Sequence, residues 1–356
     1  MDGPQAPATA ELRTALLAWY DRARRDLPWR AVPGAAADPW HVLVSELMLQ
    51  QTTVATVRGR FAPFLARFPT LQALAEAPLD EVLHAWQGLG YYRRARALHA
   101  CARTVAGQHG GRLPLDPDEL LELPGIGPYT AAAVAAIAGG RAVVPVDANA
   151  ERVLARLAAL ETPLPAARPE LRALAASLAA PTRAGDFAQA LMELGALVCL
   201  PKRPACPGCP WVSWCMATRT GQPAAFPRKQ MRPPRHVRHT VAFVLERGDG
   251  AVLFRRRPDT GLLPGMIELP STPWLPEPSQ AMHAVATAAP EGVAWAAIAG
   301  EVRYRFTHID LVCRLLRGRT ANGAAGEIWA PPARFAELAL PTMTKRLLQH
   351  AGLLGP

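Results

Sequence analysis

The sequence has few cysteines, few aromatic residues and no long apolar run. Its six cysteines are too few for a disulfide-stabilised scaffold of 356 residues. Its apolar segments are too short or too interrupted by charge to cross a bilayer, which predicts no membrane partner. The first ten residues lack the basic flank and apolar core of a secretory signal, so we expect a cytoplasmic protein.

Acidic residues are scarce as well. The chain has 29 Asp and Glu against 39 Lys and Arg, which gives a formal net charge of +10. The span between Leu194 and Leu245 has no acidic residue, whereas it contains Lys202, Arg203 and six further lysines and arginines. A solvated linker explains part of this bias, but a surface that faces phosphates explains it better.

The length and the pattern of the chain predict a multidomain protein. We expect an all-α domain over 1–220, which includes a cysteine loop at 199–215, a basic proline-rich linker over 221–237 and a small α+β domain over 238–356. Apolar spacings of three and four predict helices at 11–24, 40–58, 71–76, 79–87, 91–108, 117–122, 128–139, 148–160, 168–180 and 185–198.

The C-terminal region changes to a strand pattern. The apolar runs 239–246 and 251–257 are joined by Gly248-Asp249-Gly250, which is typical of a β-hairpin. Further strands are expected at 298–306, 309–316 and 326–330, and helices at 279–288 and 341–352.

Four cysteines lie within 17 residues, with the spacing C-x6-C-x2-C-x5-C. Such clustering argues against four ordinary buried thiols. A structural zinc site prefers two C-x2–4-C pairs, and this stretch has one. A [4Fe–4S] cluster needs four thiolates at its corners, and the spacing favours it over zinc. The ligands would be Cys199, Cys206, Cys209 and Cys215.

A helix–hairpin–helix is predicted at Leu123-Pro124-Gly125-Ile126-Gly127, which separates two helical patterns. Gly125 and Gly127 permit a tight turn, and the backbone N–H groups at the start of the next helix can hold a phosphate oxygen. A plain connection between two helices is the alternative.

Glu46 is the one formal charge in the apolar segment 40–57. Such a helix is buried, and burial raises the pKa of a carboxyl group, so that Glu46 can remain protonated near neutral pH and donate a proton. The alternative is an ion pair with a buried arginine. Asp147 precedes the helix 148–160, where it suits an N-cap and can also face a developing positive charge.

Together these motifs resemble the MutY family, adenine DNA glycosylases of the helix–hairpin–helix superfamily. The resemblance covers most of the chain and includes Leu27-Pro28-Trp29-Arg30, Ser45-Glu46-Leu47-Met48-Leu49-Gln50-Gln51-Thr52, Gly88-Leu89-Gly90-Tyr91-Tyr92, Tyr129 in the hairpin, Val146-Asp147-Ala148-Asn149 and the four cysteines. It implies a monomeric bacterial enzyme associated with the nucleoid, carrying one [4Fe–4S] cluster. Its partner would be double-stranded DNA in which adenine is paired with 8-oxoguanine or guanine.

The resemblance also implies the roles of single residues. Glu46 would protonate a flipped-out adenine and Asp147 would stabilise the oxocarbenium-like sugar, with Tyr129 and Asn149 positioning them. The implied adenine contacts are Arg30 and Gln189, and the implied wedge into the duplex is Gln51, Leu89 and Tyr91. Related bifunctional enzymes have a lysine where Tyr129 stands, so we expect a monofunctional glycosylase with little lyase activity.

The C-terminal region resembles the Nudix-like domain of the same family. The segment 280–289, where Nudix hydrolases have an acidic metal-binding helix, contains no Asp or Glu, so we expect no diphosphate hydrolysis. The family reads 8-oxoguanine with a Phe-Ser-His loop, which corresponds here to Phe306, Thr307 and His308. Threonine retains the hydroxyl group and adds a methyl group. By itself His308 reads as a surface-loop histidine.

Two alternatives remain at this point. A non-catalytic DNA-lesion binder that retains the scaffold is opposed by the presence of both Glu46 and Asp147. A lyase acting on oxidised pyrimidines is opposed by Tyr129 and by the C-terminal domain.

Overall fold

The computed structural model describes residues 9–32, 34–230, 234–258, 260, 262–321, 323, 328–338 and 340–355. The chain divides into two compact units, Met1–Leu79 with Arg94–Met231 and Asp80–Arg93 with Arg232–Pro356. The division at Met231 lies inside the predicted linker 221–237. It groups residues 80–93, which we expected in the helical domain, with the C-terminal unit.

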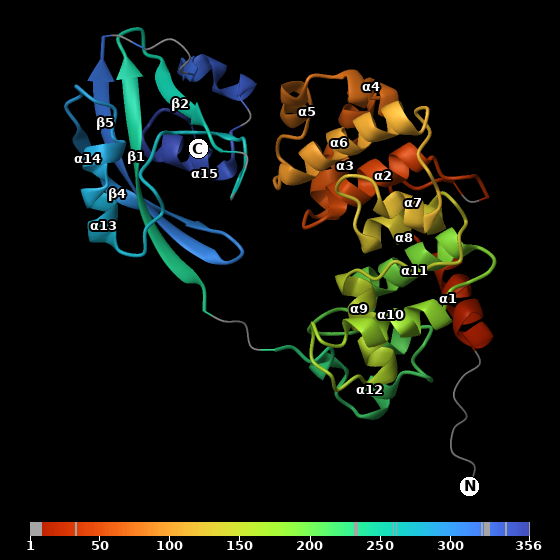
Figure 1. The fold of residues 1–356 in the computed structure, drawn as a ribbon. Coiled ribbons are helices and arrows are strands. Elements are labelled where there is room, and N and C mark those ends of the chain that lie inside the picture. Colours follow the sequence, from red (N-terminus) through yellow and green to blue (C-terminus); the bar gives the residue numbers. More distant parts are fainter. Residues whose placement is uncertain are drawn as a thin grey trace. The chain divides into compact units, whose positions relative to one another are not determined.

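The region before residue 226 is helical, as predicted (Figure 1). Its elements are α1 (Thr9–Ala23), α2 (Pro39–Leu49), α3 (Val54–Arg67), α4 (Leu71–Glu76), α5 (Leu79–Ala85), α6 (Arg93–Gln108), α7 (Pro117–Leu121), α8 (Pro128–Ile137), α9 (Ala148–Ala158), α10 (Arg168–Ser177), α11 (Ala184–Leu197), η1 (Cys206–Gly208), α12 (Met216–Arg219) and η2 (Pro223–Ala225). No helix of the described residues is long and apolar enough to span a membrane.

The prediction of one helix over 40–58 is wrong, because the chain turns between α2 and α3. Asp38 caps the start of α2, where Pro39 occupies the first helical position. Gln51 then adopts a left-handed conformation with φ 54°, and Thr53 caps the start of α3 by accepting from the Thr56 backbone N–H. Thr53 thus starts a separate helix, α3, which ends at Arg67.

A buried core joins α1, α9, α10 and α11. It includes Leu16, Leu154, Leu171, Phe187 and Leu191, each at most 1% exposed. Cys199, Cys209 and Trp214 of the cysteine loop pack against this core. The loop is therefore attached to a core that includes α9 and α11, two of the helices that line the pocket described below.

The C-terminal unit contains a six-stranded sheet in the order β3-β2-β1-β5-β4, with β6 paired to β2 (Figure 1). Its elements are β1 (His236–Arg247), β2 (Val252–Arg256), β3 (Ile267–Glu268), α13 (Pro278–His283), α14 (Val285–Ala288), β4 (Ala296–Arg305), β5 (Ile309–Thr320), β6 (Ile328–Ala330), η3 (Pro332–Glu337) and α15 (Thr342–His350). The predicted β1–β2 hairpin is present, whereas β3 was not predicted. Residues 326 and 327 of the predicted strand 326–330 lie outside the described residues.

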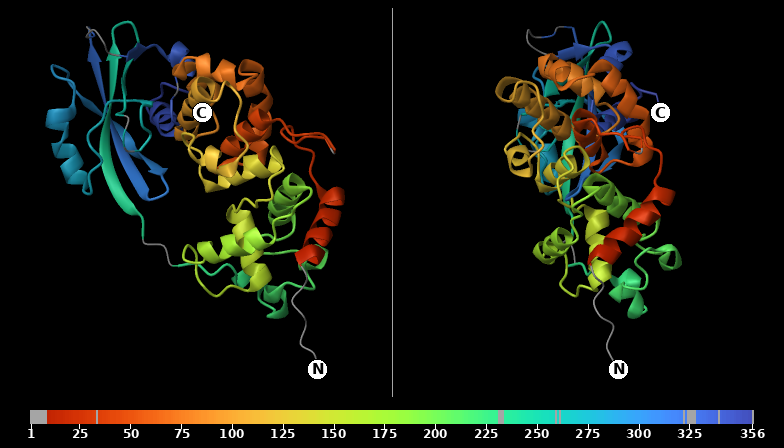
Figure 2. Two further views of the ribbon diagram at one scale, coloured as in Figure 1. Left: turned by 45° about the vertical axis from the view of Figure 1, so that its right-hand side comes forward. Right: turned by 90° about the vertical axis from the view of Figure 1, so that its right-hand side faces the viewer.

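Strand β1 pairs with β5 in parallel along its whole length, and its residues 240–245 are buried on both faces of the sheet. Its residues Ala242 and Val244 face a core that includes Leu347 of α15. Its residues Val241 and Phe243 face the opposite core, next to Ala281 of α13. The alternation of the strand thus places α15 on one face of the sheet and α13 on the other (Figures 1 and 2). The fold class, a helical domain followed by an α+β domain, is as predicted.

Candidate active site

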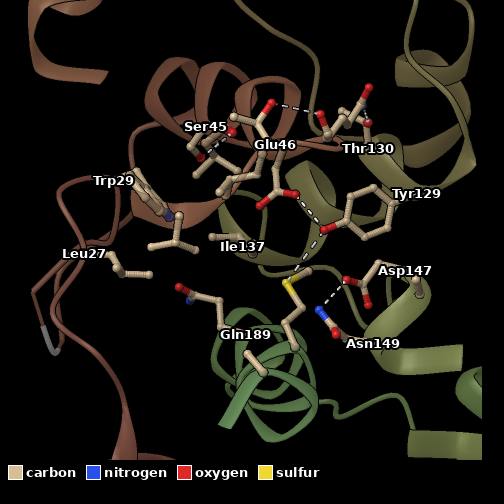
Figure 3. A pocket seen from close by; sticks show the side chains of 18 of the residues that line it. Leu27, Trp29, Ser45, Glu46, Tyr129, Thr130, Ile137, Asp147, Asn149 and Gln189 are labelled. Atoms are coloured by element: carbon tan, nitrogen blue, oxygen red, sulfur yellow. Dashed lines mark hydrogen bonds between the residues drawn. The ribbon is translucent and has the colours of Figure 1, made fainter. Parts of the chain in front are cut away.

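A pocket of about 750 Å³ opens in the helical unit. Glu46 from α2, Tyr129 from α8, Asp147 at the start of α9 and Gln189 from α11 all line it (Figure 3). Glu46 and Tyr129 are 83 residues apart in sequence, and Asp147 and Gln189 are 42 residues apart. The pocket therefore exists only in the folded unit. The structure therefore brings together the residues that the motifs singled out.

The buried carboxyl group of Glu46 accepts a hydrogen bond of 2.7 Å from the Tyr129 hydroxyl group. Burial raises the pKa of Glu46 to about 7, although the hydrogen bond from Tyr129 and the positive charge of Arg30 both favour the carboxylate. The negative charge of Asp147 acts in the same direction as burial. The Tyr129 hydroxyl group also lies 3.8 Å from the sulfur of Met192. A carboxyl group with this pKa can give up a proton near neutral pH.

Asp147 caps α9, as its position in the sequence predicts. Its Oδ1 accepts from the Ala150 backbone N–H at 2.7 Å, and its Oδ2 accepts from the Asn149 side-chain amide at 3.1 Å. Burial raises the pKa of Asp147, while these hydrogen bonds oppose the rise. The carboxylate is thus fixed in orientation at the pocket wall, where it can stabilise a positive charge.

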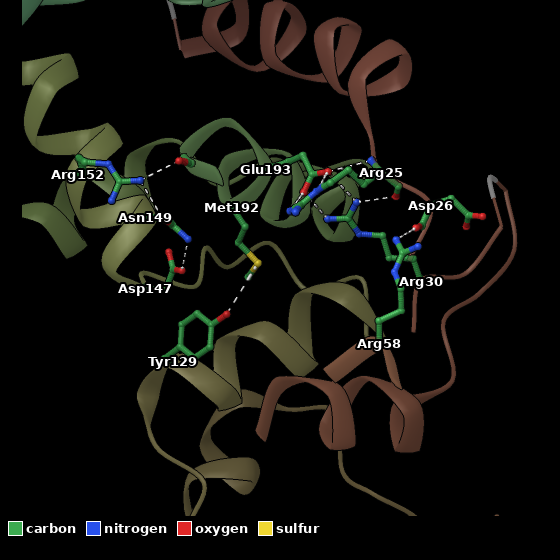
Figure 4. A network of polar contacts seen from close by, with 11 residues as sticks. Arg25, Asp26, Arg30, Arg58, Tyr129, Asp147, Asn149, Arg152, Met192 and Glu193 are labelled. Atoms are coloured by element: carbon green, nitrogen blue, oxygen red, sulfur yellow. Dashed lines mark hydrogen bonds and ion pairs between the residues drawn. The ribbon is translucent and has the colours of Figure 1, made fainter. Parts of the chain in front are cut away.

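Arg152 fixes the side chain of Asn149 by a hydrogen bond (Figure 4). Its guanidinium donates to Asn149 Oδ1 and to the Gly195 carbonyl, both at 2.8 Å, and to the Cys199 carbonyl at 2.7 Å. Helix α11 approaches α9 so closely here that a Cβ atom at Gly195 would lie 2.6 Å from the Asn149 Cβ. A continuous set of hydrogen bonds therefore joins Asp147 to the cysteine loop.

Arg30 lines the pocket, but its guanidinium is engaged by a residue that we did not predict. Glu193 of α11 accepts hydrogen bonds from both Arg30 and Arg25 (Figure 4). Burial alone would raise the pKa of Glu193, yet the hydrogen bonds from Arg25 and Arg30 lower it to about 2. The sequence held a signal for it, since Glu193 is the one charge between Ala188 and Val198. Gln189 donates to the Gly185 carbonyl at 3.2 Å and faces the pocket.

The predicted hairpin precedes α8. Gly125 has φ 75°, and a Cβ atom there would overlap the side chain of Ala97. Gly127 is the N-cap of α8, and a Cβ atom there would meet nothing within 4 Å. No side chain caps this helix, so its first backbone N–H groups are suited to an anion.

The three residues of the expected wedge differ in exposure. Gln51 is exposed and lines the pocket. Tyr91 is 51% exposed and has φ 46°, whereas Leu89 is buried at 4%. The turn that contains Gln51 is held by Arg94, whose guanidinium donates to the carbonyls of Leu47, Met48 and Gln50. These carbonyls end α2, and Arg94 supplies donors that the helix itself lacks.

The four clustered cysteines border one small cavity together with Arg156. All are free thiols. Arg156 is 1% exposed and donates to the Cys199 sulfur at 3.2 Å and to the Leu200 and Pro201 carbonyls at 2.8 Å. In the part of the chain that the structure describes, no three Cys, His, Asp or Glu side chains are close enough to hold one metal ion. Lys202 and Arg203 are exposed on this loop.

The C-terminal unit places Phe306, Thr307 and His308 in the turn between β4 and β5. Thr307 and His308 are exposed. The Phe306 ring packs against Trp274 and Tyr304, with centroid distances of 5.3 and 4.8 Å. The backbone N–H of His236 donates to the His308 carbonyl at 3.2 Å, and Arg235 donates to the Thr307 carbonyl at 3.4 Å.

Comparison with known proteins adds to this geometry. Residues 44–176 match the HhH-GPD superfamily of base excision DNA repair proteins, and residues 241–350 match the NUDIX domain. The chain is 37% identical over 401 residues to the adenine DNA glycosylase of Homo sapiens, covering 95% of this chain and 73% of that protein. It is 48% identical over 209 residues to that of Mycolicibacterium smegmatis, covering 59% and 70%. The structure of a thermostable thymine-DNA glycosylase matches with a TM-score of 0.54 and 30% identity, covering 60% of this chain and 97% of that chain.

Proposed function

The chain belongs to the adenine DNA glycosylases of base excision repair, and we propose that it removes adenine paired with 8-oxoguanine or guanine, with Glu46 as the proton donor. The observation that carries this proposal is the hydrogen bond between Tyr129 and a buried Glu46 in a pocket that also contains Asp147. Catalysis at this pocket requires that the adenine leave the base stack, because its glycosidic bond is inaccessible in a duplex.

The reaction breaks the bond between C1′ of the deoxyribose and N9 of adenine. Glu46 gives its proton to N7 of the flipped adenine, which makes the base a neutral leaving group. The sugar becomes an oxocarbenium-like cation, and the negative charge of Asp147 stabilises it. Hydrogen bonds to both oxygens of Asp147 hold the carboxylate in place for this role. Water then adds at C1′ and gives a proton back to Glu46. Gln189 and Arg30 contact the adenine edge.

The proposed enzyme is monofunctional. Strand cleavage by β-elimination needs an amine that forms a Schiff base with C1′, and the hairpin residue that faces Glu46 is Tyr129. A phenol cannot form this adduct. Borohydride trapping on the A:8-oxoguanine duplex should therefore give little covalent enzyme–DNA complex, and efficient trapping would exclude the monofunctional mechanism.

The DNA duplex is bound at several sites in this proposal. The N-terminus of α8 at Gly127 and the exposed Lys202 and Arg203 contact phosphates. Gln51 and Tyr91 enter the duplex around the lesion. The buried position of Leu89 means that this third wedge residue must move to take part. Thr307 and His308, both exposed, contact the base opposite the adenine.

We also propose that the four clustered cysteines hold one [4Fe–4S] cluster. Their thiols border a common cavity, and their spacing, with a single C-x2-C pair, favours a cluster over zinc. Arg156 would donate to the Cys199 sulfur of the bound cluster. Because hydrolysis of a glycosidic bond needs no electron transfer, the cluster would brace the loop that contains Lys202 and Arg203.

The test is single-turnover adenine release from duplexes that pair adenine with 8-oxoguanine, guanine or thymine, with alkali added to reveal abasic sites. We expect release opposite 8-oxoguanine and guanine but not thymine. Glu46→Gln should slow release at least about a hundredfold while duplex binding persists, because general acid catalysis contributes on that order. Wild-type binding without release would mean a lesion-recognition protein, and the roles of Glu46 and Asp147 would be lost.

A further inference from the structure

Glu193 has an unusual environment at the wall of the pocket. Its Oε1 accepts from the backbone N–H and Nε of Arg25 at 2.8 Å and from Nη1 of Arg30 at 3.2 Å. Its Oε2 accepts from Nη2 of Arg25 and Nη2 of Arg30, both at 2.8 Å. The Glu193 side chain is 1% exposed. A buried carboxylate with five donors is held as an anion, so it does not exchange protons in the reaction.

The donors are also constrained. The Arg30 side chain is 8% exposed, its guanidinium donates to the Arg25 carbonyl at 3.0 Å, and it lies over the Tyr20 ring at 5.7 Å. Glu193 therefore keeps two guanidinium groups at one wall of the pocket and offsets part of their positive charge (Figure 4). The three side chains together have a formal charge of +1, from two cations and one anion.

This charge matters because the proposed reaction makes positive charge twice, on the protonated adenine and on the sugar. The titratable side chains that line the pocket are Glu46 from α2, Tyr129 from α8, Asp147 at the start of α9, Glu193 from α11, and Arg25 and Arg30 before α2. Uncompensated guanidinium charge at the pocket wall would favour the ionised form of Glu46 and oppose both cations.

We propose that Glu193 is a positioning residue for the glycosylase reaction, which fixes Arg25 and Arg30 at the pocket wall and offsets their charge so that Glu46 stays protonated. The proposal rests on the proposed function of Glu46 as the general acid. It assigns to Glu193 a control over proton transfer without contact with the reacting atoms.

The test is the pH dependence of single-turnover adenine release between about pH 5 and pH 9, with duplex affinity measured in parallel. Since Glu46 must be protonated, the rate falls as the pH rises through its pKa. We expect Glu193→Gln to move this fall toward acid by about one pH unit, which is a tenfold loss of rate at a fixed pH above both pKa values. Duplex affinity should change little.

A double variant separates charge from structure. Arg30→Gln combined with Glu193→Gln restores the formal charge of +1, and we expect the pH at which the rate falls to return toward the wild-type value. Glu161→Gln, which removes a 71% exposed carboxylate paired with Arg228, is the matched control and should behave as wild type. Thermal unfolding and circular dichroism report whether each variant is folded.

Several outcomes would overturn the proposal. An equal loss of rate at every pH in Glu193→Gln would mean a merely structural role, and an unchanged profile would mean no role. If Glu193→Gln does not fold, Arg30→Gln alone decides, because loss of that positive charge must move the fall in rate toward alkaline pH. Wild-type protein that releases no adenine would refute the proposed function itself, which is a distinguishable result.

Discussion

The hydroxyl group of Tyr129 donates to Oε2 of Glu46 across 2.7 Å, from a helix that begins 82 residues after Glu46 in the chain. While Tyr129 donates to Oε2, the proton of a neutral Glu46 is favoured on Oε1. The contact thus selects the oxygen that gives up the proton. It also lowers the pKa of Glu46, against the larger effect of burial.

The first prediction concerns the pH dependence of the wild type and of Tyr129→Phe. With the pKa of Glu46 at about 7, adenine release should be fastest below pH 7 and fall at higher pH. Removal of the phenol removes a hydrogen bond that stabilises the carboxylate, so the pKa should rise and the fall should move toward alkaline pH. Single-turnover rates across the pH range measure both. A shift toward acid in Tyr129→Phe would contradict this assignment.

The second prediction concerns stability. The pKa of Glu46 is raised from its ordinary value of 4.5 to about 7, so burial of its ionised form destabilises the folded protein at alkaline pH. Glu46→Gln should therefore increase the free energy of unfolding at pH 8 by roughly 2–3 kcal/mol, and should have a smaller effect at pH 4.5. Denaturant unfolding at the two pH values measures the difference. Equal effects at both would show that the charge is not responsible.

The third prediction compares the two glycines of the hairpin. Gly125→Ala should destabilise the protein by about 2 kcal/mol or more, because its φ is 75° and the new methyl group would overlap Ala97. Gly127→Ala should cost less than about 1 kcal/mol, since its φ is ordinary and the space is open. It should weaken duplex binding instead, if phosphate approaches this N-cap. Thermal unfolding and duplex affinity give the two readouts, and equal destabilisation would refute the distinction.

The fourth prediction concerns Arg152, which joins Asn149 to the Gly195 and Cys199 carbonyls. Arg152→Gln cannot make all of these contacts, so Asn149 and the Asp147 carboxylate should lose their orientation. We expect adenine release to slow about tenfold to a hundredfold, with a smaller effect on duplex affinity. Arg168→Gln, at an exposed ion pair with Glu151, is the control. A change in affinity without a change in rate would argue against this role.

The fifth prediction concerns the cysteines. Protein purified without oxygen should contain iron and acid-labile sulfide in equal amounts and little zinc. Cys209→Ser should lose most of both, whereas Cys101→Ala, at a buried thiol in α6, should retain them. Elemental analysis and the visible absorption of the protein decide. Stoichiometric zinc in place of iron would refute the cluster.

Much of the site could be predicted because it is encoded in short local motifs. Asp147 followed by a helical pattern marks an N-cap, and the two glycines at 125 and 127 mark a hairpin. Glu46 in an apolar helix marks a buried carboxyl group. Each signal depends on neighbours in sequence, so a single chain suffices to read it.

The features that were missed depend on partners distant in sequence. Helix 40–58 was predicted as continuous, since the break at Gln51 is stabilised by Arg94, which lies over 40 residues away. Glu193 is the one charge in an apolar stretch of its helix, but the sequence does not show that its partners are Arg25 and Arg30, more than 160 residues away. Strand β3 has two residues, too few for an alternating pattern.

The entry of the chain into the sheet has a mechanical consequence. The linker ends where Arg235 and His236 donate to the carbonyls of Thr307 and His308. From His236 onward β1 is paired with β5 residue by residue, from Ile309 to Thr320. A force that pulls on the linker therefore acts first on the hydrogen bonds to this turn. The linker and this turn are thus mechanically coupled, so tension in the linker would deform the turn before it reached the rest of the sheet.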